Sequence, residues 1–330
     1  MSCGRAVVDS LFIKGRLDGE GWGGEDEPMR SIPLVRSKTV LVTGCSSGIG
    51  AATATLLRDR GWKVFPTARK SEDLGAFRLQ GFDPIPLELA DSSSVQAAAR
   101  LVLEKTGGAL GALVNNAGYC QAGAVEDLSR DALRAQFEAN LFGAHELTRA
   151  LLPALRAQGA GRIVNISSVF GRIAAPMTGA YCASKFAVEA LSDALRIELQ
   201  NTGIWVALVE PGAILSRFRK HAAEALDRHI DAPSSAFGAL YRKEIERRRR
   251  QVKKADFWTR PPEEAAAKIH HALESRHPRR RYFVTPSARL VDWTVRFVSQ
   301  GITDCMLVKR MPARQSTDAV ATPSSTTDVP

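Results

Sequence analysis

Two side chains of complementary chemistry lie one helical turn apart in the middle of the chain. Tyr181 and Lys185 belong to the segment GAYCASKFAVEAL (179–191), whose pattern predicts a helix. Residues four apart are neighbours on a helix surface. A free phenol has a pKa of ~10 and is a poor proton donor at neutral pH, but a nearby ammonium stabilises the phenolate and lowers that pKa. The pair predicts a tuned general acid. The alternative, an exposed tyrosine beside a solvated lysine, is the commoner meaning of this spacing when it stands alone.

A hydroxyl and an amide in neighbouring segments extend this chemistry. Ser168 ends the apolar run GRIVNISS (161–168), which predicts a strand, and it precedes Tyr181 by thirteen residues. Parallel sheets bind ligands at the ends of their strands, so we expect Ser168 to hydrogen-bond a substrate oxygen beside the phenol. Ser167 is the competing candidate, and a capping role is the alternative for a serine at a strand end. Asn140 lies inside a predicted helix, where asparagine is unfavourable and invites a reason.

A glycine-rich turn follows the first predicted strand and opens the first predicted helix. In TGCSSGIG (43–50), Gly44, Gly48 and Gly50 have the spacing GxxxGxG. Glycines permit a tight turn and close approach of the backbone to a pyrophosphate, and the helix N-terminus offers free N–H groups to an anion. The pattern predicts a dinucleotide loop, against the alternative of a glycine-rich turn without a ligand.

Three motifs stand in register along the chain: TGxxxGIG at the first turn, NNAG at 115–118 and YxxxK at 181–185. In order and spacing they resemble the short-chain dehydrogenase/reductase family, over about residues 38–285. The resemblance implies hydride transfer between nicotinamide and a carbonyl or alcohol carbon, with Tyr181 exchanging the hydroxyl proton. It implies that Lys185 tunes Tyr181 and binds the nicotinamide ribose, and that Ser168 polarises the substrate oxygen. Asn140 matches the asparagine that holds a water leading to the lysine.

The resemblance also implies which residues contact the cofactor. These cofactor-binding positions are Gly44, Ser46, Ser47, Gly48, Ile49, Gly50, Arg69, Glu88, Leu89, Asn116, Ala117, Gly118, Tyr181, Lys185, Pro211, Gly212, Ile214 and Ser216.

The choice of cofactor depends on the end of the second predicted strand. An acidic residue there would bind the ribose hydroxyls of NAD, but this chain has Ala68, Arg69 and Lys70. Arg69 can pair with a 2′-phosphate, so we expect NADP(H) rather than NAD(H). The alternative for Arg69 is a solvated cation. Where relatives place an adenine-contacting aspartate, this chain has Glu88.

These residues need a scaffold, and the alternation of short apolar runs with helical periodicity supplies one. It predicts an α/β fold: a single Rossmann-type, doubly wound parallel sheet of about seven strands, flanked by helices. The apolar strands suit a sheet that is buried on both faces. The expected strands span 38–44, 63–68, 83–89, 111–118, 161–168, 204–212 and 280–285. The expected helices span 48–61, 91–105, 130–159 and 180–203.

The remaining segments set the domain organisation. We expect a flexible N-terminal extension (1–36), one domain (37–312) with an irregular, basic substrate lid (213–260), and a disordered tail (313–330). The run YRKEIERRRRQVKK (241–254) is interpreted as a solvated face of the lid rather than a nucleic-acid or membrane site. After the last strand, Leu290, Trp293 and Phe297 form a helical stripe, which we expect to pack on the domain or a partner subunit rather than on a membrane.

Composition bounds the remaining function classes. The chain has 330 residues, of which 45% are hydrophobic, enough for one large core. Its five cysteines are widely spaced and include no CxxC, so we expect no metal site and a cytoplasmic location. The C-terminal part resembles retinol- and hydroxysteroid-dehydrogenase-like members, which suggests a bulky, lipophilic substrate such as a steroid or retinoid. Family members pair through their long helices, here about 131–156 and 181–200, which implies a homodimer or homotetramer.

Two alternatives remain open at this point. A cofactor-binding regulator of the same fold would not need to keep Ser168, Tyr181 and Lys185 together. A nucleic-acid or membrane-surface binder would use the net charge of +10. We expect an enzyme and no nucleic-acid partner, because the basic run lacks interleaved aromatic residues.

Overall fold

The computed structural model describes residues 31–249 and 257–308. Of the expected N-terminal extension, residues 1–30 lie outside the described part, as do residues 250–254 of the basic run and all of the expected tail, 313–330. The elements below all belong to one compact unit that begins at Ile32.

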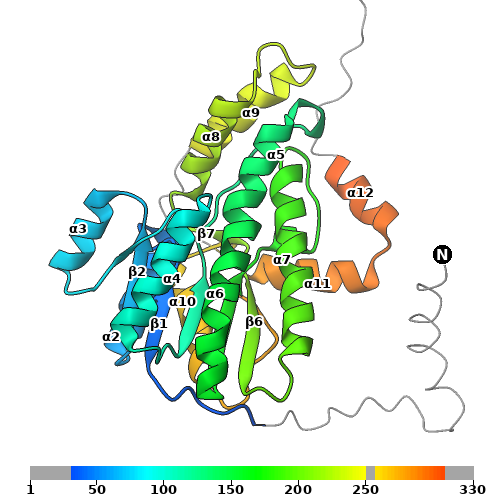
Figure 1. Cartoon of the computed structure of the whole chain (residues 1–330). Helices are drawn as coiled ribbons and strands as arrows, with labels where there is room; N and C mark the ends of the chain where they lie inside the picture. The colour runs from blue at the N-terminus through cyan, green and yellow to red at the C-terminus, as the bar shows by residue number, and fades with distance from the viewer. Residues whose placement is uncertain (1–30, 250–256, 309–330) are drawn as a thin grey trace, which may run out of the picture. The chain divides into compact units, whose positions relative to one another are not determined.

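A parallel sheet forms the centre of this unit, with strand order β3-β2-β1-β4-β5-β6-β9 (Figure 1). Every neighbouring pair is parallel. The prediction of about seven strands in a doubly wound sheet is therefore confirmed. Its strands are β1 (Thr39–Val42), β2 (Lys63–Ala68), β3 (Ile85–Pro86), β4 (Ala112–Asn115), β5 (Gly161–Ile166), β6 (Ile204–Glu210) and β9 (Arg281–Phe283).

Helices cover both faces of the sheet. The described helices are α2 (Gly48–Asp59), α3 (Ser71–Leu79), α4 (Ser92–Thr106), α5 (Arg130–Phe137), α6 (Gly143–Gln158), α7 (Gly179–Glu198), α8 (Phe218–His229), α9 (Gly238–Arg249), α10 (Pro262–Glu274), α11 (Pro286–Phe297) and α12 (Gln300–Val308). Figure 1 shows α4, α6 and α7 in front of the sheet and α10 behind it.

Strand periodicity builds the two apolar layers. Successive side chains of a strand point to opposite faces. Val40 and Val42 of β1 therefore join the core beneath α2 and α10, whereas Leu41 joins the core beneath α4 and α6. Apolar residues on both faces explain why the strands are apolar throughout, as a sheet covered on both sides requires.

Helix ends follow local sequence signals. The expected Asp/Ser cap of the helix at 91–105 is confirmed, because Asp91 Oδ1 accepts a 2.9 Å hydrogen bond from Ser93 N. The long helix expected over 130–159 is confirmed as a continuous helical run, but it was not predicted that α5 and α6 would be joined in it by a π-helical turn, η2 (Glu138–Phe142). A π turn adds a residue to the helical ladder, and such turns are frequent at functional sites.

The expected lid is more regular than its sequence suggests. Instead of irregular chain, the described part of 213–260 contains α8, α9 and a short parallel pair, β7 (Ala213–Ile214) with β8 (Thr259–Arg260). Helix α9 is held in place by Tyr241. The Tyr241 Oη donates a hydrogen bond to Asp127 Oδ2 at 2.6 Å and accepts one from Ala124 N at 2.8 Å. These contacts dock the segment on the domain.

The C-terminal helices present apolar side chains outward. Trp293 and Phe297 of α11 stack at 5.7 Å between ring centroids, and both are exposed. On the other side of α11, Asp292 pairs with Arg172 at 2.9 Å. Among the described residues, none of the helices has the length and apolar character needed to cross a bilayer.

Candidate active site

The loops that follow β1, β4, β5 and β6 meet beside the N-terminus of α7. Between β1 and β4 the strand order reverses, from β1-β2-β3 on one side to β4-β5-β6 on the other. In doubly wound sheets the crevice at such a switch point is where ligands bind. The fold thus gathers the sequence-predicted residues at one edge of the sheet.

The glycine loop is held tightly against the loop after β4. Gly44 has a φ of +69°, and a Cβ there would lie 2.7 Å from Ala117 Cα. Asn116 Nδ2 donates to the carbonyl oxygens of Thr43 and Gly44, at 2.8 and 3.0 Å. The Asn116 side chain therefore stabilises the loop, a role that we did not predict, and its contact with the cofactor stays a prediction. Ala117 contributes through its backbone, whose N–H donates to Thr43 Oγ1 at 2.9 Å.

The start of α2 fits an anion. Ser47 is the N-cap residue, but its side chain makes no capping hydrogen bond, so the first-turn N–H groups keep their donor capacity. Gly48 has a φ of +59°, and a Cβ there would lie 2.9 Å from Ser216 Cβ, on the segment after β6. The loop thus presents N–H groups without side-chain obstruction, which fits the diphosphate of a dinucleotide.

Other predicted cofactor positions differ in their surroundings. Ser46 is exposed, Ile49 is half-buried, and Gly50 packs too closely on Gly44 O to admit a side chain. Leu89 is buried in the core beneath α4. Pro211, Gly212 and Ile214 follow β6, on the same segment as Ser216.

Arg69, expected to pair with a 2′-phosphate, contacts Glu88, which occupies the position where relatives place an adenine-contacting aspartate. Arg69 Nη1 lies 3.2 Å from Glu88 Oε2, and both side chains face solvent. Glu88 Oε1 also accepts from Ala90 N at 3.2 Å. The pairing was not predicted, because the two residues follow different strands and their contact arises only when β2 and β3 align.

Cations of the lid lie near Arg69. Burial lowers the pKa of His221 on α8, the negative charge of Glu224 opposes this shift, and the positive charges of Arg69, Arg217 and Lys220 lower the pKa further. Three cations and the carboxylates of Glu224 and Glu88 therefore lie at the same end of the site.

Tyr181 lies in the first turn of α7, buried between aromatic rings. The rings of Phe170 and Phe218 meet it edge to face, with centroids at 6.3 and 5.5 Å. Burial raises the pKa of Tyr181, and a hydrogen bond with the Ser168 side chain lowers it in part. The expected net lowering of this pKa is therefore wrong for this structure, because desolvation outweighs the effects that stabilise the phenolate. Tyr181 is a protonated phenol at neutral pH.

Ser168 and Lys185 both lie close to this phenol. Ser168 directly follows Ser167 at the end of β5, and its Oγ accepts from Phe170 N at 3.1 Å. The structure pairs Ser168, rather than Ser167, with Tyr181. Lys185 Nζ donates to Ile166 O at 2.7 Å and lies 5.8 Å from the centre of the Tyr181 ring. Burial lowers the pKa of Lys185 to about 8, and the negative charge of Glu189 opposes that shift.

The π turn η2 explains the asparagine inside a helix. Asn140 is buried, its Oδ1 accepts from Tyr119 N, and its Nδ2 donates to Tyr119 O, each at 3.0 Å. Nδ2 also donates to Ser184 Oγ at 3.1 Å. A Cβ on Gly118 would lie 3.0 Å from Asn140 Oδ1 and 3.8 Å from Lys185 Nζ, so Gly118 keeps this space open.

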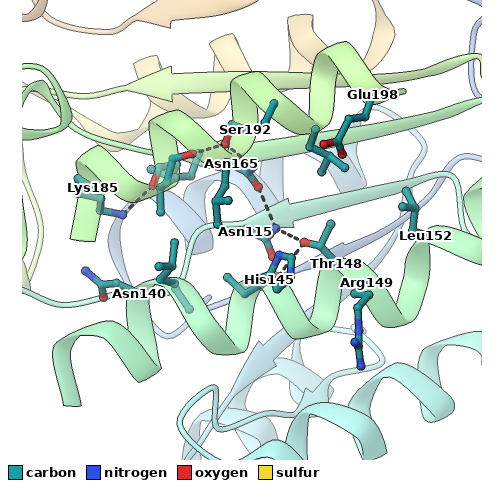
Figure 2. Close-up of a pocket in the computed structure, with 18 residues that line it drawn as sticks. Asn115, Asn140, His145, Thr148, Arg149, Leu152, Asn165, Lys185, Ser192 and Glu198 are labelled. Carbon is teal, nitrogen blue, oxygen red and sulfur yellow. Dashed lines mark hydrogen bonds between the residues drawn. The ribbon is translucent and has the colours of Figure 1, made fainter. Parts of the chain in front are cut away.

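A cavity of about 320 Å³ lies behind these residues, between α6 and α7 (Figure 2). Asn140 and Lys185 line one end, and Figure 2 shows a polar chain along its floor. In that chain Asn115 Nδ2 donates to Asn165 Oδ1 at 2.8 Å, and Asn165 Nδ2 donates to Ser192 Oγ at 2.8 Å. We did not predict these contacts, although an asparagine in each of two apolar strands was a signal for them, because buried amides need hydrogen-bond partners.

No group of three or more His, Cys, Asp or Glu side chains within the described ranges is placed to hold a metal ion. The chemistry of this site is that of hydroxyl, amine and amide groups beside a loop that fits an anion.

Comparison with known proteins agrees with this geometry. The family profile of short chain dehydrogenases matches residues 38–227. YbbO of Escherichia coli, an uncharacterized oxidoreductase, is 41% identical over 262 residues, covering 79% of this chain and 89% of its own. Rat 17-beta-hydroxysteroid dehydrogenase type 6 is 32% identical over 297 residues, covering 85% and 91%. A solved short-chain dehydrogenase from Streptomyces avermitilis superposes with a TM-score of 0.67 at 32% identity, covering 83% of this chain and 98% of its own.

Proposed function

The chain belongs to the short-chain dehydrogenase family of oxidoreductases, and from that premise we propose that it interconverts a bulky, lipophilic alcohol and its carbonyl form with NADP(H). The observation that carries this proposal is one arrangement: Ser168, Tyr181 and Lys185 lie together beside a glycine loop whose helix N-terminus is open to an anion. A bound nicotinamide cofactor supplies or accepts the hydride.

The protein's own groups handle the proton. As a protonated phenol, Tyr181 is ready to donate to the oxygen of a carbonyl substrate, and Ser168 hydrogen-bonds the same oxygen. Proton loss leaves a buried phenolate, which the ammonium of Lys185, 5.8 Å from the centre of the Tyr181 ring, stabilises in poorly screened surroundings. A regulator without turnover would not need this arrangement, so we favour an enzyme.

The preference for NADP(H) is supported by the cations at this end of the site. Arg69 is joined by Arg217, which precedes α8, and by Lys220 of α8, and together they favour a 2′-phosphate. Glu88 and Glu224 oppose this preference, because their carboxylates pair with Arg69 and Lys220. Three cations outnumber two carboxylates, and the phosphate carries a larger charge than either carboxylate.

The lipophilic substrate is supported by the apolar surroundings of the phenol. Tyr181 packs in a cluster with Cys120 and Ala222, against which Phe170 and Phe218 are placed. Phe218 and Ala222 come from α8, so the segment we interpret as a lid contributes to the wall of the site. A wall of this kind suits a ring system or alkyl chain.

A homodimer or homotetramer belongs to the same proposal. The helices expected to pair, here α5–α6 and α7, carry exposed apolar side chains that include Phe142, Phe186, Leu191 and Ile197. Such a cluster on helices of a folded domain marks an interaction surface. Light scattering at micromolar concentration tests this part of the proposal, and a monomer there would contradict it.

Turnover of a carbonyl panel tests the function itself. The panel contains steroid ketones, retinal, alkyl aldehydes and small ketones, and absorbance follows the oxidation of NADPH or NADH. We expect turnover of a lipophilic member, with higher kcat/KM for NADPH, and its loss in Tyr181→Phe. Equal activity of Tyr181→Phe would contradict the mechanism, and a large preference for NADH would contradict the cofactor assignment.

A further inference from the structure

A partly buried group of charged side chains lies next to the catalytic residues and has no part in the function proposed so far. We call it the Arg281 cluster; its members are Arg281, Glu189, Asp193 and Glu210. Arg281 Nη2 lies 2.6 Å from Asp193 Oδ2 and 2.9 Å from Glu189 Oε2, and Arg281 Nε lies 3.3 Å from Glu210 Oε1. Glu189 and Glu210 are only 6% and 1% exposed.

The cluster joins segments that carry the site. Glu189 is one helical turn beyond Lys185 on α7, and Glu210 directly precedes the Pro211–Gly212 segment. Arg172, four residues after Ser168, influences both Glu189 and Glu210 through its charge. Arg281 itself comes from β9, far along the chain.

Stability alone does not explain such a cluster. Burying several charges is expensive, and well-packed apolar residues of similar volume are often at least as stabilising. Neither carboxylate oxygen of Glu189 has a hydrogen bond of good geometry, although Oε2 forms the ion pair with Arg281 and the Ser167 side chain also stabilises the charge. Buried polar groups in that condition call for an explanation, and a functional role is one.

Each charged group around Glu189 has a defined direction of effect. Burial raises the pKa of Glu189, the Ser167 side chain, Arg281 and Arg172 lower it, and Asp193 raises it. Burial raises the pKa of Glu210 to about 8, with Glu189 adding to the rise and both arginines opposing it. Two arginines thus oppose the effect of burial on both Glu189 and Glu210.

We propose that Glu189 is a positioning residue for Lys185: its carboxylate, held by Arg281, keeps the buried amine of Lys185 in its charged form. The effect of Glu189 on the charge of Lys185 does not depend on the proposed function, whereas its effect on catalysis does. The negative charge of Glu189 opposes the lowering of the Lys185 pKa by burial. Without that charge the pKa of Lys185 falls further, so its amine loses the proton at lower pH. The C-terminal strand β9 becomes part of the catalytic apparatus through Arg281.

The direct test is the titration of Lys185 by NMR, with 13Cε-labelled lysine in the full chain. Lys185→Arg assigns its resonance. We expect the titration midpoint of Lys185 to move to lower pH in Glu189→Gln, which keeps the side chain's shape and removes its charge. Should Glu189→Gln fail to fold, Glu189→Asp retracts the charge and shifts the midpoint in the same direction. An unchanged midpoint in the folded variant overturns the proposal, whatever the enzyme's substrate.

Two controls separate this role from a merely structural one. Asp193→Asn alters the same cluster one turn further from Lys185, and Asp131→Asn alters an exposed pair with Arg134 on α5. We expect both to leave the Lys185 midpoint in place. With a turned-over substrate, the alkaline limb of kcat/KM should move to lower pH in Glu189→Gln alone. Superimposable profiles of wild type and Glu189→Gln would overturn the catalytic part, while Tyr181→Phe separately tests the proposed function.

Discussion

The two ends of the site each hold ionisable side chains, but these side chains are buried at one end and exposed to water at the other. At the catalytic end, Lys185 and Tyr181 are 5% and 6% exposed, and burial shifts the pKa of each. At the adenosine end, the side chains of Arg69 and Glu88 are 70% and 39% exposed. Water screens the second pair, whereas the first pair acts through a medium of low dielectric constant. Desolvation therefore sets the chemistry, and weaker, screened contacts set the choice of cofactor.

The largest effect should come from the buried end. In Lys185→Met the apolar side chain fills the site without an ammonium, so kcat/KM should fall by roughly 10²–10⁴-fold, the usual contribution of general acid–base catalysis. Thermal unfolding should show no loss of stability at neutral pH, because a costly buried charge is removed. Lys63→Met, at an exposed position on β2, is the matched control and should leave kcat/KM unchanged. A Lys185→Met enzyme of near-normal activity would contradict the importance of desolvation.

The pH profile is the next test of the same difference. The pKa of Lys185 is lowered to about 8, so its ammonium is present below that pH and is lost above it. The kcat/KM of carbonyl reduction should therefore fall as pH rises through about 8, approaching tenfold per pH unit for a single essential group. Stopped-flow measurement between pH 6 and 10 with constant ionic strength shows the limb. A flat profile up to pH 9.5 would mean that the charge of Lys185 is not required.

The same contrast separates what the sequence predicts from what it leaves out. Gly44, Ser168 and Tyr181 were predictable as parts of one site, because each belongs to a motif at a strand end or helix start. The order of elements predicted the parallel sheet for a similar reason: strand and helix periodicities are local. Motifs and periodicity depend on residues that are near one another in the chain, so the local structures that they predict are present in the fold.

Properties that depend on tertiary burial or pairing were not predictable. The pKa of Tyr181 changes in the direction opposite to the expected one, because spacing along a helix does not reveal how much water the fold removes. The Arg69–Glu88 pair and the Arg281 cluster join residues from separate strands. The π turn around Asn140 follows from packing against Tyr119 and Ser184, which lie in other segments.

A smaller effect is expected at the exposed end. Arg69→Ala removes a charge-assisted contact worth about 1.5–3 kcal/mol, so the KM for NADPH should rise by roughly ten- to a hundredfold while that for NADH changes little. Arg78→Ala, which removes an exposed arginine of α3, is the control. Equal changes for the two cofactors would mean that Arg69 does not contact the 2′-phosphate.

The smallest effect should come from the partner of that arginine, and its sign is the opposite. Glu88→Gln keeps an oxygen for Ala90 N but releases Arg69 from its ion pair. Exposed pairs contribute roughly 0–1 kcal/mol, so the KM for NADPH should fall only a few-fold, with little change in melting temperature. In an Arg69→Ala background the same substitution should have no such effect, because the released group is gone. If the KM for NADPH still falls in the absence of Arg69, Glu88 repels the phosphate directly. The exposed end would then resemble the buried end, because both would act through charge rather than through a paired contact.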